Sequence, residues 1–198
     1  MSVVTVRKDL KNLADPIMSD LGFKVTGDLD EYVRVTSDGD RHGVLLDVMR
    51  QSSSYVLSLR TFIYYSEIES CVGIRQSSDS YTINIYQDAV SLPILGYEAE
   101  QLTPVLSQLI DSKSEPFFKK YGYSQAAIDN FASNNSKEWF TSDKVSQYKI
   151  RFASAIHSQD KNAILEISEE ARKYCCKPWS LTYRSEIEEM LESVKKYI

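Results

Sequence analysis

The sequence predicts an α+β protein: an N-terminal helix, a four- to five-stranded, mostly antiparallel sheet, and then a set of helices packed on that sheet. Three observations predict this class. Apolar residues recur at helical spacing as far as Leu21, they alternate along strands from there to about Ile68, and helical spacing returns after Val90. We therefore expect a helix-plus-sheet part in residues 1–90 and a helical part in residues 91–198, together forming one compact unit.

The first segment is predicted to be an amphipathic helix, because its apolar residues recur at intervals of three and four. These residues are Val6, Leu10, Leu13, Ile17 and Leu21. Pro16 has no amide donor, so we expect the helix to kink near Asp15 or to restart after it. Gly22 then ends the helix as a C-terminal cap, and the first strand begins at Phe23.

Consecutive hairpins build the predicted sheet. Their turns are Gly27-Asp28-Leu29-Asp30 and Ser37-Asp38-Gly39-Asp40, which are rich in residues that accept positive φ or bond their own backbone. In the long strand over residues 55–63, the odd-numbered side chains are expected to face the core. A further strand is predicted over residues 81–86. The strand that precedes residues 55–63 is expected to contribute three inward-facing residues, Val44, Leu46 and Val48.

Helices are predicted after residue 90. The first begins at Thr103-Pro104, where a capping residue precedes a proline at the first helical position. A second starts at Ser114-Glu115-Pro116 and stops at Gly122, and Ser124 caps a third through Phe131. After Ser142, apolar spacing predicts three more helices, over residues 145–156, 164–174 and 187–198, with a capping signal in residues 158–160 before the second of them.

The charge balance and the cysteines limit the classes of function. The formal net charge of −5 over 198 residues argues against a protein that grips nucleic-acid phosphates and favours a basic protein partner. Three cysteines make a poor disulfide framework, so a reducing compartment is expected. The adjacent pair Cys175-Cys176 could be redox-active or lipidated, although burial at a helix end is the commoner outcome. Without a signal peptide or an apolar run long enough to span a bilayer, we expect a cytoplasmic protein.

Residues that support catalysis or metal binding are sparse. The two histidines, His42 and His157, lie in no recognisable catalytic motif, and structural roles are expected for both. No Cys-x-x-Cys or His-Glu-x-x-His spacing is present, and no glycine-rich nucleotide loop. The sequence therefore predicts no catalytic residue, no metal and no cofactor, and we do not expect an enzyme.

One candidate binding surface is formed by the acidic hairpins. Between Asp28 and Asp47 there are six acidic and two basic residues, a local net charge of −4 that would steer a basic partner towards the sheet. The alternatives are ordinary solvated turns or a calcium site, for which the later bidentate glutamate is missing. The predicted partner-binding residues of these hairpins are Asp28, Asp30, Glu31, Asp38 and Asp40.

A second candidate surface is the face of the sheet that points away from the core. It combines aromatic side chains with arginines, which are the residue types that dominate binding hot spots. Its predicted residues are Arg34, Asp47, Arg60, Phe62, Tyr64 and Tyr86. The alternative is that the C-terminal helices cover this face, which would turn Phe62 and Tyr64 into a second core and make the two arginines partners of Asp47.

The first third of the chain carries a resemblance. A helix with an internal proline, then Leu21-Gly22-Phe23, then Arg34 on the next strand and Gln51 at the end of the third, resembles a bacterial family of unknown function. Such small α+β domains are similar to the immunity proteins that neutralise toxins in interbacterial competition. This chain departs from the pattern in its acidic hairpins and in the Ser-rich connection over residues 76–80, so no functional residue is carried over.

Taken together, the residues and the resemblance imply a non-enzymatic protein-binding protein, an immunity protein that occludes a basic toxin. Two alternatives stay open. One is an enzyme or small-ligand binder whose pocket lies between sheet and helices and is lined by Arg34, Arg60, Tyr64 and Tyr86. The other is an adaptor or assembly subunit, which would form a concentration-dependent oligomer.

Overall fold

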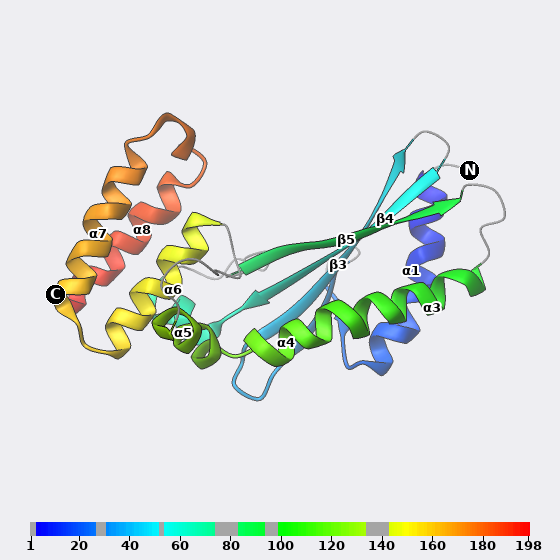
Figure 1. The fold of residues 1–198 in the computed structure, drawn as a ribbon, viewed down its shortest axis with the longest axis horizontal. Coiled ribbons are helices and arrows are strands. Elements are labelled where there is room, and N and C mark those ends of the chain that lie inside the picture. Colours follow the sequence, from blue (N-terminus) through cyan, green and yellow to red (C-terminus); the bar gives the residue numbers. More distant parts are fainter. Residues whose placement is uncertain (1–2, 27–30, 52–53, 74–82, 94–98, 134–142) are drawn as a thin grey trace. The chain divides into compact units, whose positions relative to one another are not determined.

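The chain divides into two compact units in a computed structural model that describes residues 3–26, 31–51, 54–73, 83–93, 99–133 and 143–198 (Figure 1). The sheet unit comprises Met1–Ser37, Arg41–Ile63 and Asn84–Lys120, and the helical unit comprises Asp38–Asp40, Tyr64–Ile83 and Tyr121–Ile198. Residue 90, after which the sequence predicts the helical part, lies within a strand.

Most helices and strands lie within a single unit, and together they confirm the α+β class. The sheet unit holds α1 Val3–Asp20, β1 Lys24–Val25, β2 Glu31–Val35, β3 Arg41–Gln51, β4 Ser54–Tyr64, β5 Ile83–Pro93, α3 Ala99–Leu109, the π-helix η1 Ile110–Ser114 and α4 Glu115–Tyr121. The helical unit holds α2 Ser66–Val72, α5 Ser124–Ser133, α6 Lys144–His157, α7 Lys161–Cys175, η2 Pro178–Ser180, α8 Arg184–Val194 and η3 Lys195–Tyr197.

Helix α1 is one continuous helix that contains Pro16, so it does not restart after Asp15. Its predicted C-terminal cap is confirmed. Gly22 has a φ of +80°, and its amide donates to Ser19 O at 2.9 Å while the amide of Phe23 donates to Met18 O at 2.8 Å. This pair of bonds is a Schellman motif, and it turns the chain directly into β1.

Among the described residues, the sheet has five strands in the order β1-β2-β3-β4-β5, as expected for consecutive hairpins. Strands β1 and β2 are antiparallel, as are β2 and β3, where Arg34 lies opposite His42 and Tyr32 opposite Val44. Figure 1 shows β4 and β5 also running in opposite directions. Residues 83–86 of the predicted strand lie in β5, which extends to Pro93, and residues 81–82 are outside the described residues.

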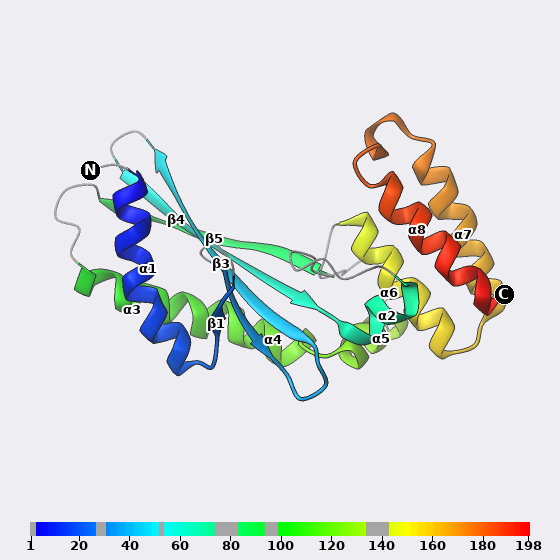
Figure 2. The same cartoon turned by 180° about the vertical axis from the view of Figure 1, so that it is seen from behind.

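Several helices of the sheet unit bond these strands on one face, here called the inner face, and Arg7 of α1 also reaches Asp47 on the opposite face. Tyr32 donates to Asp15 of α1, and the ring of His42 stacks on Phe118 of α4. Thr61 of β4 bonds Ser114 of η1. Figure 2 shows the same arrangement from behind, with α1 beside α3. The inward residues expected in β3 are confirmed, since Val44, Leu46 and Val48 are buried whereas Leu45, Asp47 and Met49 are not. In β4, Leu57, Leu59 and Ile63 are buried, but Val56, Ser58 and Phe62 on the opposite side are buried too.

The opposite side of the sheet is called the outer face. Side chains alternate along a strand, so the residues between the inward-facing ones point to it. Its described members are Glu31, Val33, Val35, Arg41, Gly43, Leu45, Asp47, Met49, Val56, Ser58, Arg60 and Phe62. Part of it is tightly packed: a Cβ at Gly43 would lie 1.9 Å from Cζ of Phe62, so the phenyl ring occupies the space that any other residue at position 43 would need.

The segment after β5 is more continuous than the sequence predicts. Helix α3 begins at Ala99 rather than at Thr103, so Pro104 lies inside the helix. It passes through η1 into α4 without a break, and Figure 1 shows the three as one rod. The π-helical turn adds a residue to the helix just before Glu115, which sets the direction in which α4 presents its side chains.

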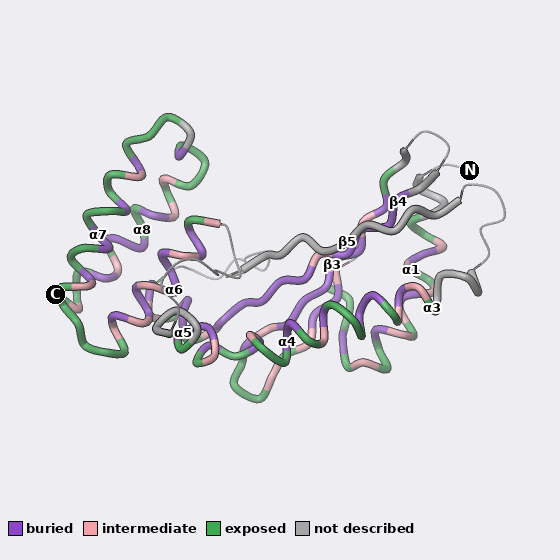
Figure 3. Tube along the Cα trace, viewed as in Figure 1, coloured by how far each residue is buried: buried purple, intermediate pink, exposed green. Residues whose placement is uncertain are grey.

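The helical unit contains the three predicted C-terminal helices as α6, α7 and α8. Asp143 and Asp160 cap the first two by accepting from the amides of Ser146 at 2.8 Å and Ala163 at 3.0 Å. The buried stripes of these helices meet in one core, visible as the inward purple turns in Figure 3. The short helix α2 also contributes to this core through Val72, and it was not predicted. None of the described helices combines the length and hydrophobicity needed to cross a bilayer.

Candidate functional site

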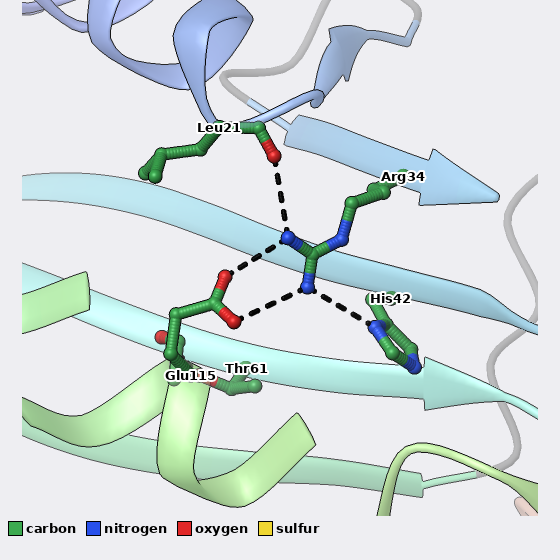
Figure 4. Close-up of polar contacts among 6 residues, drawn as sticks. Leu21, Arg34, His42, Thr61 and Glu115 are labelled. Carbon is green, nitrogen blue, oxygen red and sulfur yellow. Dashed lines mark hydrogen bonds and ion pairs between the residues drawn. The ribbon is translucent and has the colours of Figure 1, made fainter. Parts of the chain in front are cut away.

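A cluster of polar contacts in the sheet unit surrounds Arg34 of β2 (Figure 4). Its guanidinium donates from Nη1 to Leu21 O at 3.2 Å and to Oε1 of Glu115 at 3.0 Å. From Nη2 it reaches Oε2 of Glu115 and Nδ1 of His42, each at 3.4 Å. The arginine thus ties the end of α1 and the start of α4 to two strands of the sheet.

Aromatic rings enclose the guanidinium. Its central carbon lies 4.6 Å from the ring centre of Phe23 and 5.6 Å from that of Phe118. The imidazole of His42 stacks on Phe118 with the ring centres 4.4 Å apart and the planes 1° from parallel. Because Arg34 can only donate, Nδ1 of His42 must accept, which places the imidazole proton on Nε2.

The arrangement can clamp helices to the sheet, but it offers little to a substrate. Both terminal nitrogens of Arg34 are already engaged in two contacts each, by a carboxylate, a carbonyl and an imidazole. His42 is only 4% exposed, so its ring is inaccessible to a ligand of any size. The chemistry of this cluster is therefore that of a bidentate structural ion pair.

The predicted outer-face residues do not come together. Arg34 lies on the inner face, because it pairs with His42 beneath α4, so its assignment to the outer face is wrong. Phe62 and Tyr64 are buried at 6% and 3% exposure, which also contradicts an exposed aromatic patch. Tyr86 lies in β5, whose side chains are outside the described part of the structure.

Asp47 and Arg60 do share the outer face. Their nearest charged atoms are 4.0 Å apart, and Arg7 of α1 adds a shorter pair with Asp47 at 2.6 Å. Because Arg34 and Arg60 lie on opposite faces of the sheet, they do not line one pocket in the way that the small-ligand alternative requires.

The acidic hairpins are only partly described. Asp28 and Asp30 lie outside the described residues, Glu31 begins β2, and Asp38 is exposed in the turn before β3. Asp40 is 1% exposed, so its assignment to a partner-binding surface is wrong.

The carboxylate of Asp40 instead holds the first residues of two helices. It accepts from the amide of Ser66 at 2.8 Å and from the amide of Ser124 at 3.0 Å, and both serine hydroxyls bond it as well. The first amides of α2 and α5 have no partner within their own helices, so one carboxylate satisfies both.

The helical unit contains a buried ion triad that the sequence analysis does not predict. Nζ of Lys149 lies 3.0 Å from Glu69 and 2.8 Å from Glu186, and Lys149 and Glu69 are each 2% exposed. A signal existed, because Lys149 falls on the apolar stripe of its helix beside Tyr148 and between Val145 and Phe152. Its partners come from other helices, so the sequence could not identify them.

Neither metals nor relatives add to this picture. Within the described ranges, no group of three or more His, Cys, Asp or Glu residues is placed to hold a metal ion. Comparison of the chain with protein-family models, with curated proteins and with solved structures found no match.

Replacing Arg34 by lysine is expected to lower the free energy of unfolding of the sheet unit by about 2 kcal/mol, because a lysine cannot bridge Glu115, Leu21 and His42 at once. Urea unfolding followed by far-UV circular dichroism measures the loss. Arg7→Lys is the matched control: its single ion pair is half exposed and should cost less than about 0.5 kcal/mol. Equal costs for the two variants would contradict the clamp.

Proposed function

We propose that the protein is a non-enzymatic protein-binding protein, an immunity protein that neutralises a bacterial toxin by occluding it, and that the outer face of the sheet unit is its contact surface. The observation that carries the proposal is the exposure of the apolar side chains of Val35 and Met49 on the outer face. Helices α1 and α4 and the segment η1 bond the inner face. On the outer face Val33, Val56 and Phe62 are buried, whereas Val35 and Met49 are exposed apolar side chains.

The exposed part of the outer face has the composition of a binding surface. Val35 is 65% exposed and Met49 is 48% exposed, and Leu45 lies half-buried between them along the sheet. Asp47, which lies near Arg60, is on the same face between Leu45 and Met49, so charged and apolar side chains alternate on this surface. Methionine and arginine are enriched in protein interfaces.

Charge and burial support the same proposal. The net charge of −5 steers a basic partner towards the protein and repels nucleic acid. The buried acidic and basic side chains in the described part of the chain are engaged inside the fold, where a substrate has no access. They are Asp40, His42, Glu69 and Lys149.

The experiment is a growth assay with the toxin domain encoded beside the gene for this chain. Co-expression of the chain should restore growth, and the purified pair should form a complex. Val35→Arg and Met49→Arg should each weaken binding about tenfold or more, since truncating or charging an interface hot spot costs about 2 kcal/mol or more. Both residues are exposed, so the variants should fold.

Leu165→Arg is the matched control. This leucine of α7 is 47% exposed, against 48% for Met49, but it belongs to the helical unit. Its substitution should leave binding unchanged. If the wild-type chain neither protects cells nor binds the neighbouring gene product, the immunity function is wrong. If it protects but tolerates both outer-face variants, the contact surface is wrong.

A further inference from the structure

A pocket in the helical unit combines thiols with charged groups of both signs. It has a volume of about 350 Å³, and it is lined by Arg172, Cys175, Cys176, Arg184, Glu188 and Leu191. That volume is at the lower end of the range for small-molecule sites. The residues come from the end of α7 and from α8, which lie side by side in both ribbon views (Figures 1 and 2).

The two thiols of the pocket differ in accessibility. Cys176 is exposed at the C-terminal cap of α7, whereas Cys175 is only 8% exposed. Burial and the Glu188 carboxylate raise the pKa of the Cys175 thiol, although Arg184 lowers it, so this thiol stays protonated. Cys176 is therefore the sulfur that a reagent in the pocket can reach.

The three charged side chains that line the pocket differ in the contacts that they make with the rest of the helical unit. Arg184 is fixed in place, because its Nε and Nη2 donate to Cys175 O at 3.2 and 2.6 Å. Arg172 and Glu188 make no hydrogen bond or ion pair with the described residues. The pocket thus offers two guanidiniums and one carboxylate around one exposed thiol.

We propose that Cys176 is a site of reversible S-thiolation by a low-molecular-weight peptide disulfide whose halves each carry two carboxylates and one amino group. Arg172 and Arg184 attract the carboxylates, and Glu188 attracts the amino group. The inference is independent of the proposed toxin binding, because the pocket lies entirely in the helical unit.

The chemistry is a thiol–disulfide exchange. The thiolate of Cys176 attacks one sulfur of the disulfide, a new bond forms between Sγ and that sulfur, and the original S–S bond breaks. The second half leaves as a thiolate and takes up the proton that Cys176 lost. The Cys176 sulfur is oxidised and the leaving sulfur is reduced, so no further oxidant is needed. Because Cys175 stays protonated and buried, it does not displace the adduct.

The test compares three disulfides on the reduced full-length protein: oxidised glutathione, neutral hydroxyethyl disulfide and cationic cystamine. Intact mass and peptide mapping follow the rate at Cys176, with Cys71 of α2 as the internal control. After normalisation to Cys71, glutathione disulfide should modify Cys176 about fivefold faster than cystamine does, and 0.5 M salt should reduce that preference. Cys176→Ser should abolish the adduct at this position.

Arg172→Gln should remove about half of the preference or more, whereas Lys173→Gln, a neighbouring exposed residue outside the pocket, should leave it unchanged. Both positions are exposed, so the variants keep the fold. Equal rates at Cys176 for the anionic and cationic disulfides, or equal effects of the two variants, would overturn the proposal. So would modification confined to Cys71.

Discussion

Lys149→Met should lower the free energy of unfolding of the helical unit by about 3–5 kcal/mol. The substitution leaves the carboxylate of Glu69 buried at 2% exposure without the ammonium that lies 3.0 Å from it, and an uncompensated buried charge costs about this much. The measurement is urea unfolding followed by tryptophan fluorescence, because Trp179 lies in the helical unit.

Two further variants separate burial from pairing. Lys173→Met removes an ion pair of similar length, 2.8 Å to Glu169, but both side chains are about 70% exposed, and the cost should stay below about 0.5 kcal/mol. The double variant Lys149→Met with Glu69→Leu should recover most of the lost stability, because a buried ion pair is often replaced by apolar side chains without loss. A double variant as unstable as Lys149→Met alone would show that the triad is not the cause.

The same lysine makes stability depend on alkaline pH. Burial lowers the pKa of Lys149, but the carboxylates of Glu69 and Glu186 raise it by more, so its value in the folded protein lies above the ordinary 10.5. A raised lysine pKa contributes stability that is fully present below pH 10.5 and is lost as the pH rises through the folded value. The wild-type chain should therefore lose stability in that alkaline window more steeply than the double variant does.

Asp40→Ala should cost the helical unit about 3 kcal/mol. The carboxylate is the shared partner of the first amides of α2 and α5, and each buried amide left without an acceptor costs about 1–3 kcal/mol. Asp40→Asn should cost about 2 kcal/mol, because its amide nitrogen would face one of the two N–H donors. The same fluorescence-detected urea unfolding measures both variants.

Asp38→Ala is the matched control for Asp40. Asp38 lies two residues earlier in the same turn and is exposed, so its loss should change stability by less than about 0.5 kcal/mol. If Asp38→Ala and Asp40→Ala were equally destabilising, the turn conformation rather than the double cap would explain the effect of Asp40.

Several features of the fold could be predicted because their causes are local. The apolar spacing of α6, α7 and α8 repeats every three to four residues, and Asp160 caps α7 through an amide only three residues away. Gly22 ends α1 through bonds to Ser19 and Met18. Each of these features rests on neighbours within one turn of the chain, so the sequence carries the whole signal.

The candidate site was less predictable. The alternation of β3 correctly separates Val44, Leu46 and Val48 from Asp47, whereas the predicted outer-face position of Arg34 is wrong. The face of one strand relative to its neighbour depends on the register across the turn, and a shift of one residue moves every side chain to the other side. Composition and alternation within a strand do not contain that register.

The sequence by itself determined the α+β class, the C-terminal helices, the net charge of −5 and the absence of familiar metal and nucleotide motifs. Only the tertiary structure decided what the charged residues do. Asp40 meets Ser124 across 84 positions, Lys149 meets Glu69 across 80, and Arg34 meets Glu115 across 81. The sequence predicts that an aspartate in a turn is exposed to solvent. Asp40 is buried and caps both α2 and α5 because the first residues of these two helices meet at its carboxylate. Such contacts depend on how elements pack, and packing is a property of the whole chain rather than of any local pattern.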